Sequence, residues 1–177
     1  MVTATASILI AVLAYALNQR GETTRTKRQA HLDRLNSQLR DLYGPLLVLV
    51  ESNERTWDAF RQQHLPPAEE RLRGGQLTEE QDRLWRCWAL TVFVPTARRI
   101  RDIIVDHGHL FIEDQMPQVV LSFCAHVASY EVTVAEWEAG GEANVLVRHP
   151  GEGFAAYVRE SYRSLKEAQA GVLRAQA

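Results

Sequence analysis

The sequence predicts an all-α protein, with an N-terminal membrane anchor helix followed by an antiparallel four-helix bundle of proline-kinked helices. Three observations predict this class. Beyond residue 24, apolar residues recur in steps of three and four along most of the chain, which is the helical period. No stretch alternates apolar and polar residues over the length of a strand. Residues 1–19 carry no charged side chain.

Residues 1–19 are the predicted anchor, and the span 8–17 within them is almost wholly apolar. A helix of this length reaches about 28 Å, close to the hydrocarbon thickness of a bilayer. A cleaved signal peptide is one alternative, because Ala14, Tyr15 and Ala16 resemble a cleavage site, but no basic residue precedes the apolar run. A helix of a soluble protein is the other alternative.

Residues 20–31 form a predicted basic juxtamembrane segment. This segment contains one acidic residue, Glu22, and four basic ones: Arg20, Arg25, Lys27 and Arg28. Positive charge on this flank favours a single-pass membrane protein with its N-terminus outside and the bulk of the chain in the cytoplasm. The same four side chains are predicted to contact anionic lipid headgroups.

Residues 32–177 are the predicted cytoplasmic bundle. The first helix carries a leucine seam with steps of three and four: Leu32, Leu35, Leu39, Leu42, Leu46 and Leu49. The same spacing is typical of a parallel coiled coil between two copies, so the seam leaves both assemblies open. Pro45 interrupts this helix and Pro95 interrupts the next. Each proline removes one backbone hydrogen bond, which predicts a kink.

Turn and capping residues set the other boundaries. The segment 65–76 holds two prolines and two glycines, which predicts a loop. Thr78 and Gln81 predict a capping box at the start of the next helix, which should end near Gly108. Two further apolar seams predict helices over 117–138 and from residue 154 onward. The four tryptophans fall at core-facing positions, which predicts helix packing rather than a ligand cage.

The connector DHGHLFIEDQMP, residues 106–117, holds the one cluster of potential metal ligands in the sequence: His107, His109, Glu113 and Asp114. A metal ion needs three or four ligands that converge on one point. Histidine near a helix C-terminus and acids near a helix N-terminus are also favoured by the helix dipole, so capping explains the same residues. No HExxH and no paired ExxH motif is present. We therefore favour a plain connector and keep the metal site as the alternative.

No other motif indicates catalysis. His126 lies beside an apolar seam and is expected to be partly buried and hydrogen-bonded. The acids at 51 and 54 and the arginines at 98, 99 and 101 are expected on solvated helical faces. There is no GxSxG motif and no glycine-rich phosphate loop. We predict no cofactor, and the sequence argues against an enzyme.

Composition narrows the class of partner. The length of 177 residues suits one domain with a sizeable core. The net charge of −2, from 20 basic and 22 acidic residues, argues against a nucleic-acid partner. Cys87 and Cys124 are far apart within helical patterns, so we expect two reduced, mostly buried thiols.

The run RLNSQLRDLYGPLLVLVESNERTWDAF, residues 34–60, resembles small uncharacterised bacterial proteins that carry an N-terminal anchor. The stretches 111–117 and 124–131 extend this resemblance, which implies no activity and no site residues. The sequence predicts a membrane-anchored helical protein-interaction module that self-associates or joins a membrane complex. The alternatives are a metal-dependent enzyme or sensor that uses the 106–114 bend, and a lipid-surface sensor that uses the basic segment.

Overall fold

The structure is all-helical, as predicted, and its helices form a bundle. The computed structural model describes residues 2–66, 77–143 and 145–175, and these contain no β-strand. The α-helices are α1 (Val2–Ser37), α2 (Gly44–His64), α4 (Glu79–Trp88), α5 (Val94–Asp106), α6 (Gln118–Glu138) and α7 (Glu152–Arg174). The short turns are η1 (Gln38–Tyr43), η2 (Ala89–Phe93) and η3 (Gly108–Leu110).

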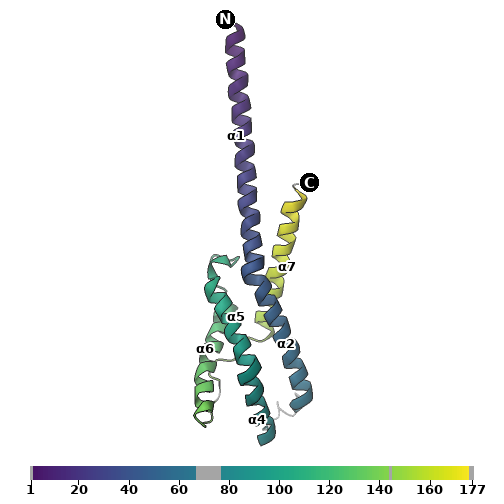
Figure 1. Ribbon diagram of the computed structural model, residues 1–177, viewed down its shortest axis with the longest axis vertical. Helices are drawn as coiled ribbons and strands as arrows, with labels where there is room; N and C mark the ends of the chain where they lie inside the picture. Colours follow the sequence, from purple (N-terminus) through teal and green to yellow (C-terminus); the bar gives the residue numbers. More distant parts are fainter. Residues whose placement is uncertain (1, 67–76, 144, 176–177) are drawn as a thin grey trace.

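The helices pack around one core. α2 and α6 each contact both α5 and α7, and the chain reverses direction between α2, the α4–α5 arm, α6 and α7 (Figure 1). α1, α2, α5, α6 and α7 contribute apolar side chains to this core from one face, whereas α4 has no buried residue. The fully buried side chains at the centre include Leu42, Tyr43, Leu46, Val120, Val127, Phe154 and Val158.

Neither proline breaks its helix. Pro45 and Pro95 each follow a π-helical turn, η1 and η2. In these turns the backbone N–H of Gly44 donates to the Leu39 carbonyl, five residues back, and the N–H of Val94 donates to Ala89 in the same way. The wider turn leaves room for the ring of the following proline. It also accommodates the loss of one helical hydrogen bond, because proline has no backbone N–H to donate. The predicted kinks are therefore single wide turns inside continuous helices.

Glycine at position 44 is explained by the same turn. A Cβ at residue 44 would lie 2.4 Å from the Leu39 carbonyl oxygen, much closer than a carbon and an oxygen can approach. The π-turn also shifts the helical phase by inserting one residue. Leu35, Leu42 and Leu46 are buried as the seam predicts, and Val50 is buried while Leu49 is only partly buried. The leucine seam is therefore confirmed as far as Leu46, and the buried face shifts by one residue beyond it.

The predicted helix ends agree well with the structure. Thr78 and Gln81 form the expected capping box, with both hydrogen bonds present. α5 ends at Asp106, just before Gly108. Most of the predicted loop at 65–76 lies outside the described residues.

α1 continues without a break through the predicted anchor and the basic segment. It projects from one end of the bundle, and the C-terminal part of α7 runs beside its lower half (Figure 1). The side chains from Asn18 to His31 are all exposed, and Leu35 is the first buried residue after them. Over residues 18–37 of this helix, the bundle therefore buries side chains only at the C-terminal end.

Candidate functional site

The predicted metal ligands lie at the bend between α5 and α6. The rings of His107 and His109 have centroids 6.4 Å apart. Glu113 accepts a hydrogen bond of 2.9 Å from the Tyr157 hydroxyl, and Asp114 is exposed. Within the described ranges, no group of three or more His, Cys, Asp and Glu side chains is placed to hold a metal ion. The metal site at this bend remains a sequence-based prediction.

Hydrogen bonds hold the same connector against η1 and α7. Gln38 donates from Nε2 to the Leu110 carbonyl at 2.9 Å. The backbone N–H of Ile112 donates to the Tyr43 hydroxyl at 3.3 Å, and the hydroxyls of Tyr43 and Tyr157 are 2.9 Å apart. Because Tyr157 donates to a carboxylate, Tyr43 donates to Tyr157. This chain of hydrogen bonds gives the connector a structural role.

The four predicted lipid-contact residues all lie on the exposed part of α1: Arg20, Arg25, Lys27 and Arg28. Arg28 also donates from Nη1 to the Ala175 carbonyl at the end of α7, at 3.0 Å. Their contact with lipid headgroups remains a prediction.

The charged faces that we expected to be solvated form contacts between helices. Arg98 binds the Glu131 carboxylate through two hydrogen bonds, of 2.9 and 2.6 Å, and Arg101 adds a third of 3.3 Å. This pairing joins α5 to α6 and, with Arg98 as the main cause, lowers the pKa of Glu131. Arg99 is exposed, as expected. For Arg98 and Arg101 the expectation of a solvated face was wrong, because their partner lies on a helix distant in sequence.

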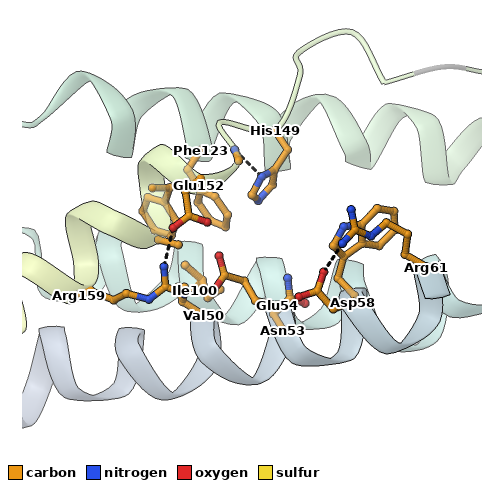
Figure 2. A pocket seen from close by; sticks show the side chains of 14 residues that line it. Val50, Asn53, Glu54, Asp58, Arg61, Ile100, Phe123, His149, Glu152 and Arg159 are labelled. Atoms are coloured by element: carbon orange, nitrogen blue, oxygen red, sulfur yellow. Dashed lines mark hydrogen bonds and ion pairs between the residues drawn. The ribbon is translucent and has the colours of Figure 1, made fainter. Parts of the chain in front are cut away.

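A cavity of about 560 Å³ opens between α2, α6 and the beginning of α7. Figure 2 shows Glu54, Asn53 and Asp58 of α2 on one side of it, with His149 and Glu152 opposite. The lining residues are Val50, Asn53, Glu54, Trp57, Asp58, Arg61, Ile100, Phe123, His149, Gly151, Glu152, Phe154, Ala155 and Arg159.

A second cavity of about 430 Å³ adjoins the first, and most of its wall is apolar. Both cavities are lined by Asn53, Trp57, Ile100, Phe123 and His149, so these residues mark the passage between them. The other lining residues of the second cavity are Trp85, Phe93, Val94, Ala97, His126, Val127, Tyr130, Trp137, Ala143 and Val145. Cavities of these volumes are typical of small-molecule sites.

Asn53 carries the one buried side-chain oxygen or nitrogen without a hydrogen-bond partner among the described residues, its Oδ1. A buried acceptor without a partner costs about 1–3 kcal/mol of stability, and native proteins rarely leave one. The sequence does contain a signal for it. Asn53 is a polar residue in a run of otherwise apolar positions with heptad spacing, between Val50 and Trp57, that our reading of the leucine seam did not single out.

Arg159, which lines the first cavity, forms ion pairs with several acidic side chains. Its guanidinium contacts three carboxylates: Glu51 at 2.5 Å, Glu152 at 2.8 Å, and Glu54. Burial raises the pKa of Glu54 although Arg159 opposes this. The surplus of carboxylates over guanidinium groups leaves this end of the cavity negative.

Two histidines lie at the cavities: His149 lines both of them, and His126 lines the second. His126 is buried, as predicted, and its Nδ1 lies 2.6 Å from the Val147 carbonyl. Because a carbonyl only accepts, this Nδ1 carries the proton. The His149 ring lies edge-on to His126, with centroids 5.0 Å apart, and its Nδ1 accepts from the Gly151 N–H at 2.9 Å. Although part of His149 is exposed, burial of its ring lowers the pKa to about 4, so it is neutral near pH 7.

The aromatic side chains have a double role that spacing did not reveal. Trp57 packs edge-on against Trp85 and Phe93, with centroids 5.7 and 5.8 Å away. This packing was predicted, but the same rings, with Trp137, also form a cavity wall. Burial raises the pKa of Tyr130, on that wall, to about 12.

The outer face of α6 is apolar as well as its inner face. Five uncharged residues with steps of four and three are exposed along it: Leu121, Ala125, Ala128, Val132 and Ala135. We call these residues the α6 stripe. By length and composition, α6 is the one helix among the described residues able to cross a membrane. Its most apolar 18-residue window has a mean hydropathy of 1.2, and 28% of this window is buried. Its buried residues belong to the core, so the stripe is what its packing leaves unexplained.

The expectation for one cysteine was wrong. Cys87 is exposed, whereas Cys124 is partly buried, and both thiols are free. Burial raises the pKa of Cys124.

Comparisons with protein-family models, with curated proteins and with solved structures find no match.

Proposed function

We propose that this chain is a membrane-anchored protein-interaction module, an antiparallel four-helix bundle that self-associates through the α6 stripe. The observation that carries this proposal is the stripe itself. Leu121 and Val132 are 47% and 66% exposed, and the alanines between them are exposed as well. A continuous apolar face on a helix is typical of a surface that another helix covers.

A second copy is the occupant that the stripe fits best. Its residues follow the steps of four and three that align two helices in a coiled-coil contact, and three of the five are alanines that allow close approach. Two copies anchored in one membrane present their α6 helices in the same direction. A two-fold axis along the membrane normal then pairs each stripe with itself.

Two features of α1 support the anchor. Its exposed part leads away from the bundle, and the segment 1–19 at its far end has no charged residue. The basic side chains of residues 20–28 follow at once, where anionic headgroups would attract them. We place the N-terminus outside and the bundle in the cytoplasm, following the charge of this flank.

Self-disulfide formation tests the stripe. In a cysteine-free background, Cys87→Ser and Cys124→Ser, we would introduce Ala128→Cys in the full chain and oxidise native membranes. A residue beside a two-fold axis meets its own copy within the Cα separation of about 4.4–6.8 Å that a disulfide needs. We therefore expect a dimer band.

The matched control is Val48→Cys, another exposed helical position, at 65%, on α2. We expect this variant to stay monomeric on the gel under the same oxidation, because α2 lies on the other side of the bundle from α6. Equal cross-linking at both positions, or none at position 128, would refute pairing through the stripe.

A further inference from the structure

The two joined cavities have the features of a binding site, and one of these is a buried acceptor. Asn53 lines both cavities, and its Oδ1 is buried without a partner. In Figure 2 its amide lies beside Glu54, on the cavity side of α2. If the Asn53 amide turned toward the cavity, a ligand N–H could donate to this oxygen and remove the unfavourable free energy of an unpaired buried acceptor. This oxygen therefore favours a ligand that carries a hydrogen-bond donor.

The charged side chains that line the first cavity indicate the charge of this donor. Three carboxylates and two guanidinium groups line the first cavity, so negative charge is in surplus. Arg61 is paired with Asp58 at 2.9 Å. Arg159 is shared among three acids, two of which, Glu54 and Glu152, line the cavity. Because these carboxylates outnumber the arginines that neutralise them, the site attracts a cation rather than an anion.

The second cavity defines the rest of the ligand. Its wall of Trp57, Trp85, Phe93, Tyr130 and Trp137 presents ring faces and edges that suit a flat apolar group. Such rings also attract a cation that lies over them. The protein itself has one such contact, in which the Arg86 guanidinium lies 5.4 Å from the ring centroid of Trp137.

We propose that the joined cavities bind an organic ammonium ion, with its apolar, preferably aromatic, body in the second cavity and its ammonium group at Asn53 and Glu54. The ammonium N–H groups would donate to Asn53 Oδ1 and to the Glu54 carboxylate, which lie on successive residues of α2. This site is independent of the α6 stripe and does not require self-association.

Calorimetric titration of the full chain in phosphatidylcholine nanodiscs tests the proposal, with empty nanodiscs as the blank. The three probes have the same phenyl body and differ in their head group: 4-phenylbutylamine, the neutral alcohol 4-phenylbutanol and the anion 4-phenylbutyrate. We expect the amine to bind about tenfold or more tightly than the alcohol, since hydrogen bonds to charged groups are the stronger ones. The carboxylate should not bind measurably.

Two site variants locate the binding. Asn53→Leu removes the acceptor and keeps the bulk, so the amine should lose about tenfold in affinity. The same variant should unfold at an equal or higher urea concentration, because it also removes the unpaired buried oxygen. A merely structural role of Asn53 would give the opposite stability change. Glu54→Gln should also weaken the amine, whereas Glu160→Gln, an exposed control on α7, should not.

Three results would overturn the proposal. The first is no heat from the amine at millimolar concentration, and the second is equal affinity for the amine and the alcohol. The third is an amine affinity that Asn53→Leu leaves unchanged in a folded protein.

Discussion

His149 is the residue whose protonation most directly affects the bundle. Its ring lies edge-on to Phe123 with centroids 5.6 Å apart, and its Nδ1 accepts from the Gly151 N–H. Protonation at Nδ1 would end that hydrogen bond and place a charge beside the rings of Phe123 and His126. The pKa of about 4 expresses this preference of the folded state for the neutral ring.

The free energy of unfolding should therefore depend on pH through His149. The folded-state pKa lies below the unfolded value of about 6.5, so between these two values the unfolded chain binds more protons. The stabilisation is complete above about pH 6.5 and is lost as pH falls toward about 4. We expect His149→Gln to reduce the loss of stability between pH 7 and pH 5, measured by urea unfolding with tryptophan fluorescence.

His31→Gln is the control, because His31 lies on the exposed part of α1. This variant should show the same pH dependence as the natural chain. If His149→Gln also kept the full pH dependence, protonation of His149 would not be its source.

At the scale of the element, the π-turns let two prolines lie within long helices. η1 also presents Gln38 and Tyr43 to the connector that leads into α6, where both form hydrogen bonds. Its extra residue sets the phase with which α2 faces the cavities. A change in η1 therefore affects the core, the connector and the position of Asn53 together.

Gly44→Ala tests this dependence. A Cβ placed 2.4 Å from the Leu39 carbonyl oxygen must displace the turn. We expect the free energy of unfolding to fall by about 1–3 kcal/mol, as for overpacked sites in general. Urea unfolding of the full chain measures the change.

Gly171→Ala is the matched control, since a Cβ there meets nothing within 4 Å. It should leave stability unchanged or raise it by up to about 1 kcal/mol, because alanine favours the helix. Equal stability of both variants would show that the π-turn does not require glycine.

Periodicity predicted the elements well and their partners poorly. The seams on α6 and α7 and the cap at Thr78 depend on local spacing, and the structure confirms them. The contacts of Arg159 with α2 join residues more than a hundred positions apart, and no local pattern carries that information. The cavities arise where bulky rings fail to fill the space between helices, which heptad positions cannot reveal. The available signal for the cavities was Asn53, a polar residue at a heptad position whose neighbours in the heptad pattern are apolar.

At the scale of the whole molecule, the protein combines a compact bundle with one long projecting helix. The bundle holds the cavities between its helices and presents the α6 stripe on its outer face. α1 carries the exposed basic residues and leads to the uncharged segment 1–19. In our proposal this helix fixes the bundle at the membrane surface, where parallel copies meet through their stripes.

Alkaline carbonate extraction of membranes from cells that make the full chain tests the anchor most directly. The comparison is a variant that lacks residues 1–19 and keeps every core residue that the structure describes, from Leu35 onward. We predict that the full chain stays in the membrane pellet and that the shortened variant is released to the supernatant. Release of both proteins, or retention of both, would contradict an anchor in residues 1–19.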